Sequence, residues 1–145
     1  MNRFLVGCYS GIIAGIIMGI IVSIANMLNL TSYHSIKIAA GIFLQEVFLS
    51  PGLLWTVIGW VVHLQIAIIY GVIINYLLQL SGSEYCLQKG LFVGGFSWLF
   101  DLGIVAPVIG YNIMTNLNAS DLLFSFVLHL FFGTFTAWLI MKLGK

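Results

Sequence analysis

Charged side chains are scarce in this chain. Only 6% of its 145 residues are Asp, Glu, Lys or Arg, whereas 61% are hydrophobic. In soluble domains about a quarter of all residues are charged, because polar side chains must cover an apolar core. The composition excludes a water-soluble globular fold and indicates an integral membrane protein, so we expect the lipid bilayer to be its partner. The net charge of +1 and the lack of a basic cluster argue against a nucleic-acid partner.

Cysteine is rare as well, and several enzyme motifs are missing. Cys8 and Cys86 cannot build a disulfide framework, and neither has a second ligand at metal-site spacing, so we expect free thiols. The sequence contains no phosphate-binding glycine loop, no paired-carboxylate pattern and no hydrolase motif. These absences favour a protein that is not an enzyme, with no catalytic residues.

Four runs are apolar over the length of about 20 residues that a membrane-spanning helix needs. They cover residues 4–28, 51–80, 90–106 and 122–141. Ser50 and Pro51 resemble an N-cap followed by a first helical residue, Ser120 and Asp121 resemble a second cap, and Pro107 predicts a kink or an extension of the third run. We expect one domain over residues 1–145, with an all-α integral membrane fold of two tandem helical hairpins. A cleaved signal peptide is the alternative for the first run, since Ser23-Ile24-Ala25 fits a cleavage site.

The first connection is long and the basic residues are unevenly distributed. Residues 33–49 have an amphipathic pattern, which predicts a helix lying on the outer membrane surface. In a four-span topology one side carries four basic residues and the other only Lys37; the four are Arg3, Lys89, Lys142 and Lys145. This asymmetry predicts that both termini are cytoplasmic.

Small residues, many of them glycine, recur at helical spacing in every span. The first run carries a ladder of glycines four residues apart, and the later runs have shorter versions of it. Such strips allow helix backbones to approach closely. We therefore predict helix-packing roles for Gly7, Gly11, Gly15, Gly19, Gly59, Gly71, Gly90, Gly94 and Gly133. The ladder of the first run would pack inside the bundle or form the contact of a homo-oligomer.

Three ionisable residues fall within the apolar runs. His63 and His129 each lie on a strip of small residues, and Asp101 follows Gly94 and Ser97 on the third run. Counted from the cytoplasmic edge at 1.5 Å per residue, the three lie roughly 18 to 24 Å deep. We expect them to form one polar layer, because a charged group inside a bilayer is costly without a partner.

This layer admits three interpretations. Imidazole titrates near neutral pH, so the residues could hold or pass a proton in proton-coupled transport or in ion or proton conduction. Alternatively, the histidines form hydrogen bonds between helices in a structural or partner-binding protein. A third alternative is a haem or metal held between His63 and His129, although no cofactor is required by the pattern.

The second half of the chain resembles the YagU-like group of uncharacterised bacterial inner-membrane proteins. The resemblance extends over about residues 62–141 and is carried by the spacing of His63, Gly71, His129 and two motifs, Gly90-x-x-x-Gly94 and Pro107-x-x-Gly110. It departs from the family pattern at Asp101, where the family has no acid, and at Leu102, where it has a histidine. The resemblance implies a multi-pass protein of the bacterial plasma membrane, without implying an activity.

Overall fold

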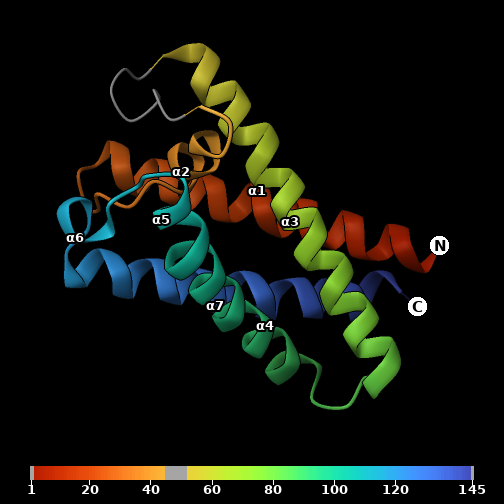
Figure 1. The fold of residues 1–145 in the computed structure, drawn as a ribbon. Coiled ribbons are helices and arrows are strands. Elements are labelled where there is room, and N and C mark those ends of the chain that lie inside the picture. The colour runs from red at the N-terminus through yellow and green to blue at the C-terminus, as the bar shows by residue number, and fades with distance from the viewer. Residues whose placement is uncertain (1, 45–51, 145) are drawn as a thin grey trace.

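The computed structural model describes residues 2–44 and 52–144, and this part of the chain is helical with short connections. In order, the elements are α1 (Arg3–Met27), α2 (Ser35–Gly41), α3 (Leu53–Ser81), α4 (Cys86–Phe100), the π-helical turn η2 (Asp101–Val105), α5 (Ala106–Val108), α6 (Ile113–Asn116) and α7 (Ala119–Leu143). Figure 1 shows the long helices crossing one another, with both termini at the same end.

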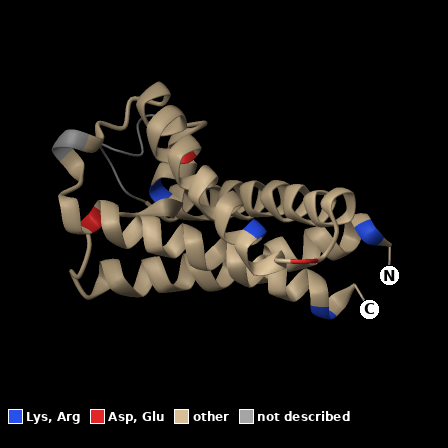
Figure 2. Ribbon diagram, turned by 90° about the horizontal axis from the view of Figure 1, so that it is seen from below, with Lys and Arg blue, Asp and Glu red and all other residues tan. Residues whose placement is uncertain are grey.

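Four helical segments of the described chain are long and apolar enough to cross a membrane: α1, α3, the continuous segment Cys86–Val108, and α7. The prediction of an all-α fold with four spans is therefore confirmed. Charged residues are sparse along the whole ribbon (Figure 2). The most extensive packing joins α1 to α3 and α4 to α7, and α1 also contacts α7. The bundle thus consists of two consecutive hairpins that meet along α1 and α7.

The connection between α1 and α3 differs from the expected surface helix over residues 33–49. α2 covers only Ser35–Gly41, and all of its residues except Lys37 are buried. It packs on α3, where Gly59 leaves room for the backbone carbonyl of Ile36. This short helix therefore belongs to the protein core. The rest of the expected helix beyond residue 44, and the Ser50-Pro51 cap, lie outside the described residues; α3 begins at Leu53 after Gly52.

Glycine allows the backbones of paired helices to touch. A Cβ on Gly11 would collide with the carbonyl of Ala67, and a Cβ on Gly71 would collide with the backbone of Gly7 and Gly11. In the other hairpin Gly90 and Gly133 face each other in the same way. The remaining ladder positions, Gly15 and Gly19, face the side chains of Ala67 and Trp60. The ladder of the first helix thus packs inside the bundle against α3.

Replacement of Gly11 by alanine tests this packing. Gly11→Ala places a methyl group against the Ala67 carbonyl, and such overpacking costs about 1–3 kcal/mol. The detergent-solubilised variant should lose its monodisperse elution at a lower temperature than the wild type. Gly103→Ala is the matched control, since nothing lies within 4 Å of the added methyl group. Equal thermal stability of the two variants would contradict the packing role.

The third span continues past Pro107 through a π-helical turn. Proline has no N–H, and its ring would meet the carbonyl four residues earlier in a regular α-helix. The chain avoids this clash by widening the turn before the proline, so that the N–H of Ala106 reaches the carbonyl of Asp101. Asp101 is thereby the first residue of an irregular turn within a membrane span, a type of distortion that is frequent at functional sites.

The N-terminus of α7 is joined to the loop that follows α1. Asn118 caps the helix, and its backbone N–H donates to Asp121 Oδ2 (3.1 Å) in a capping box, so the helix begins before the expected cap at Ser120. The other carboxylate oxygen of Asp121 accepts hydrogen bonds from Thr31 Oγ1 (2.6 Å) and from the N–H of Ser32 (2.9 Å). Three donors satisfy this buried acid, which anchors the loop leading into α2.

Substitution of Asp121 tests the anchor. Asp121→Asn turns one acceptor into an amide donor that faces another N–H, and an unsatisfied buried polar group costs about 1–3 kcal/mol. We expect a lower thermal stability and faster hydrogen exchange at Ser32 and Asn118. Ser120→Ala, at the exposed neighbouring position, should behave like the wild type. Unchanged exchange in Asp121→Asn would show that the loop is held by other contacts.

Candidate functional site

A cavity of about 60 Å³ lies where α2 covers the bundle. It is lined by residues of all four spans and of α2, and its polar lining residues are Tyr33, Ser35, His63, Tyr70, Ser97, Asp101 and His129. A buried water needs about 10–15 Å³ by this kind of measure, so the space accommodates a few water molecules. All three ionisable residues of the predicted layer therefore border one small polar space.

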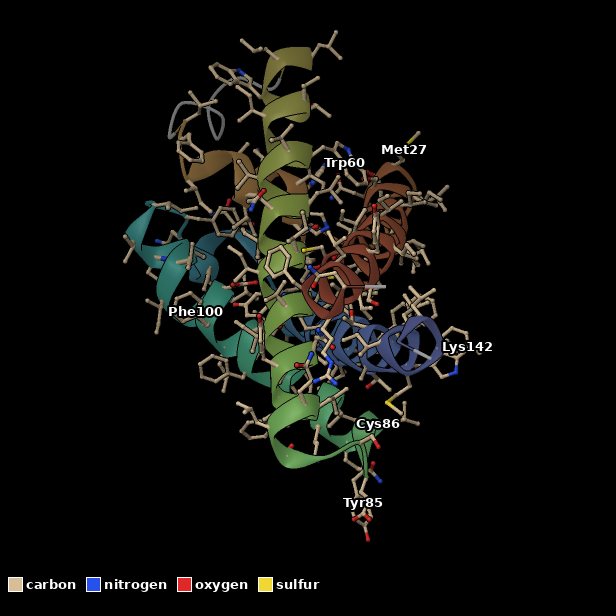
Figure 3. The ribbon with its side chains drawn as sticks, turned by 90° about the vertical axis from the view of Figure 1, so that its right-hand side faces the viewer. Met27, Trp60, Tyr85, Cys86, Phe100 and Lys142 are labelled. Carbon is tan, nitrogen blue, oxygen red and sulfur yellow. The ribbon has the colours of Figure 1, made fainter. Side chains whose placement is uncertain are left out.

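Figure 3 shows the side chains around α3, which runs in front of the other spans. Trp60 projects from α3 toward α1, where its ring packs against Gly19 and edge-on to His63, with 5.9 Å between the ring centroids. Phe100, on the opposite side, ends α4 directly before Asp101. The cavity lies nearer to the first residues of α3 and α7 than to their last, because His63 and His129 belong to the first half of each helix.

Asp101 is held by two neighbours. Tyr70 Oη donates a hydrogen bond of 2.9 Å to Oδ1, and His129 Nε2 lies 3.7 Å from Oδ2. The side chain of Asp101 is 26% exposed, while that of His129 is 5% exposed. The carboxylate therefore joins a buried imidazole to space outside the packed core.

The hydrogen bonds of His129 define which of its nitrogens carries a proton. Nδ1 lies 2.7 Å from the backbone oxygen of Ser125. A carbonyl oxygen only accepts, so Nδ1 is the donor and bears hydrogen. In a neutral ring Nε2 then carries no hydrogen, and its lone pair faces Asp101 Oδ2. Because two acceptors repel each other, this pair favours a proton, another cation or a donating water molecule between the two atoms.

His63 occupies a different position in the cavity wall. Its Nε2 lies 3.0 Å from the backbone oxygen of Gly15, so by the same reasoning Nε2 is the donor. This bond joins α3 to α1, and it is possible because the glycine ladder brings the two backbones close. Among the described residues of the layer, Asp101 and His129 are the two whose ionisable side-chain atoms lie within 4 Å of each other. The layer thus consists of a close pair, Asp101 and His129, with His63 beside it in the cavity wall.

Three polar lining residues were not identified from the sequence. Tyr70 follows His63 by seven residues and could have been found from helical periodicity, since that spacing returns to the same face. Tyr33 and Ser35 lie in and after the loop beyond α1, where no periodicity applies. The Tyr33 ring centroid is 6.4 Å from that of His129. Burial, and then the charge of Asp101, raise the pKa of Tyr33, so its hydroxyl remains protonated.

Ser35 introduces an unsatisfied polar group. Its residue is 7% exposed, and its hydroxyl oxygen is one of the buried side-chain atoms in the described part of the chain that lack a hydrogen-bond partner. A buried hydroxyl without a partner costs about 1–3 kcal/mol. The position of Ser35 on the cavity wall therefore favours an occupant that satisfies it.

The cavity does not suit a haem. Pockets that hold drug-sized or cofactor-sized molecules measure roughly 300–1,000 Å³, several times this space. Within the described residues, no group of three His, Cys, Asp or Glu side chains is arranged to hold a metal ion. The described residues therefore do not fit a haem, or a metal centre with three such ligands, between His63 and His129.

No family model, curated protein or solved structure matches this chain.

Proposed function

We propose that this chain is a multi-pass membrane protein that binds and releases protons at Asp101 and His129, as a step of proton-coupled transport or of proton conduction. This proposal depends on one observation: His129 Nε2 and Asp101 Oδ2 face each other at a distance of 3.7 Å. With Nδ1 already donating to Ser125, the two facing acceptors favour a positive charge between them, and a proton is the simplest one. An imidazole also exchanges protons readily near neutral pH.

The surroundings of the pair support a functional role over a purely structural one. A charged group within a bilayer costs several kcal/mol or more before compensation, and such groups most often mark ion or proton pathways. Asp101 has one direct hydrogen bond, from Tyr70, and borders a space large enough for water. A carboxylate used only for packing would gain more from a complete set of donors, as Asp121 has.

The lining of the cavity does not extend into the half of the bundle that holds the two termini. Buried apolar side chains occupy that half, among them Ile74. Proton passage to that side therefore requires a second conformation, as in alternating access. The two hairpins, each with a histidine on its second helix, are a suitable basis for it, since repeats that move against each other are common in transporters. A homo-oligomer would supply a wider pathway than one bundle encloses.

We further propose that the protein lies in a bacterial plasma membrane with both termini in the cytoplasm. Arg3, Lys89 and Lys142 belong to the ends of spans on the side of the termini, and Lys37 belongs to the opposite side. This distribution supports the orientation through the preference of basic residues for the cytoplasm. Membership of the YagU-like group, inferred from motif spacing, remains part of the same proposal.

A structural or partner-binding protein is the second candidate, and the hydrogen bond of His63 favours it. The bond to the Gly15 carbonyl joins α1 to α3 and has the form expected of a packing interaction. In this alternative His63 and His129 stabilise helix contacts, and the cavity is a packing defect filled by water. The alternative leaves the partial exposure of Asp101 without a role.

Proton flux in reconstituted liposomes tests the proposal. The protein is placed in vesicles with an internal pH-sensitive dye, and a potassium diffusion potential drives protons inward. We expect a flux that Asp101→Asn and His129→Ala both reduce to the level of protein-free vesicles. Glu84→Gln is the control, because this acid lies in the exposed connection between α3 and α4 and should leave the flux unchanged.

The absence of flux in well-folded wild-type protein, with either direction of the gradient, would favour the structural alternative. A flux that persists in both variants would exclude the Asp101–His129 pair as the pathway.

The ring nitrogens of the histidines provide a second test. In protein labelled with ¹⁵N-histidine, His129 should carry hydrogen on Nδ1 and His63 on Nε2, because each of these atoms donates to a backbone carbonyl. Asp101→Asn should alter the signal of His129 Nε2 and leave that of Nδ1 nearly unchanged. A His129 protonated on Nε2 alone would contradict the geometry on which the proposal rests.

A further inference from the structure

We propose that the cavity is a binding site for a small monovalent metal cation of the size of sodium, which replaces the proton at Asp101. This inference rests on the proposed function and names the ion that would be exchanged against protons. Three features of the cavity support it: the spacing of Asp101 and His129, the unsatisfied hydroxyl of Ser35 and the charge of the wall.

The distance between Asp101 Oδ2 and His129 Nε2 exceeds that of a hydrogen bond. Charge-assisted N–H···O contacts measure about 2.7–2.9 Å, well below the 3.7 Å found here. Ligands that bind a hard cation at 2.3–2.6 Å, at right angles to each other, lie about 3.3–3.7 Å apart. Sodium has nearly this ligand distance. The gap is therefore too long for a direct hydrogen bond and leaves room for an ion bound to the carboxylate oxygen beside the imidazole.

Oxygen atoms dominate the polar wall of the cavity. Asp101 supplies a carboxylate, and Tyr70 Oη keeps a lone pair after donating its proton to Oδ1. Ser97 Oγ likewise keeps its lone pairs, because it donates to the carbonyl of Gly94 (2.8 Å). Ser35 Oγ is buried without a partner in the described structure. Carboxylate and hydroxyl oxygens are typical ligands of hard cations, and water in the cavity can complete the shell.

Ser35 is the observation that points directly to an occupant. It begins α2, the helix that covers the cavity, and it is one of the residues that line the wall. A bound ion or its water shell would satisfy this oxygen and thereby hold α2 against the bundle. The same serine would contribute little to a protein whose cavity served packing alone.

The charge of the wall favours a monovalent ion. The titratable groups that face Asp101 are Tyr33 from the first loop, His63 and Tyr70 from α3, and His129 from α7. α1, α2 and α4 present only uncharged residues to the cavity, among them Met18, Ser35 and Ser97. With the histidines neutral, one carboxylate balances one positive charge. A divalent ion would leave an uncompensated charge in a medium of low dielectric constant.

The exchange conserves charge. The metal cation enters as the proton of the Asp101–His129 pair leaves to water, so the net charge of the site is the same before and after. The two ions exclude each other because they occupy the same lone pairs.

Ion binding to the purified protein tests the inference. The detergent-solubilised chain is titrated with sodium chloride, with choline chloride to keep the ionic strength constant, and binding is measured by calorimetry and by thermal stability. Sodium should stabilise the wild type saturably and displace protons, which a dye detects in weakly buffered solution. Asp101→Asn should abolish both effects.

Ser35→Ala and Ser10→Ala form the matched pair. Ser10 also has a buried hydroxyl without a partner in the described structure, but it does not line the cavity. Removal of one ligand hydroxyl at Ser35 should weaken sodium binding about two- to tenfold. Ser10→Ala should leave the affinity unchanged. This comparison remains decisive if Asp101→Asn fails to fold.

Three results would overturn the inference: no saturable effect of sodium beyond that of choline, equal binding by Asp101→Asn, or equal affinities of the two serine variants and the wild type. A proton flux that depends on Asp101 in sodium-free vesicles, together with any of these results, would leave the proposed proton function standing. The loss of both would remove both proposals.

Discussion

The close approach of helix backbones at glycine determines the rest of this structure. In a bilayer the lipid chains are as apolar as leucine, so helices associate through van der Waals contact and hydrogen bonds. Gly94 of α4 lies against the backbone oxygen of His129, and a Cβ there would collide with it. Asp101 follows Gly94 by seven residues, two turns along the same face, and this packing brings its carboxylate beside the His129 ring. The polar pair exists because the glycines allow the two helices to touch.

The same constraint acts on His63. Its bond to the Gly15 carbonyl requires α1 and α3 to be close, and Gly7 and Gly11 continue that contact along the helix pair. Each histidine thus donates one N–H to a backbone carbonyl and directs its ring into the cavity wall. The two acids of the described spans contrast with each other. Asp121 is buried and has three donors, whereas Asp101 is partly exposed and has one hydrogen bond and one imidazole. That difference separates a structural carboxylate from a candidate for ion binding.

Much of the fold follows from local pattern. The four spans were predicted because apolar runs of this length have few other stable conformations, and the roles of the glycines followed from their spacing. Counting residues from the ends of the spans grouped Asp101 with the histidines, because the rise per residue converts a residue count into a depth along the helix. Neither pattern could reveal Tyr33, whose place against His129 depends on the loop that Asp121 anchors. The sequence could not predict the position of α2 either. An amphipathic segment can lie on a membrane surface or pack against another helix, as α2 does at Gly59.

By itself, the amino-acid sequence determined that this protein is a helical membrane bundle with few charges and with small residues on its contact faces. These properties depend on composition and periodicity, which act over one or two helical turns. Only the tertiary structure decided that Asp101 meets His129, that Tyr70 donates to Asp101, and that Ser35 closes the cavity from α2. These contacts join segments far apart in the chain, so they depend on how the helices cross and on the path of the connecting loop.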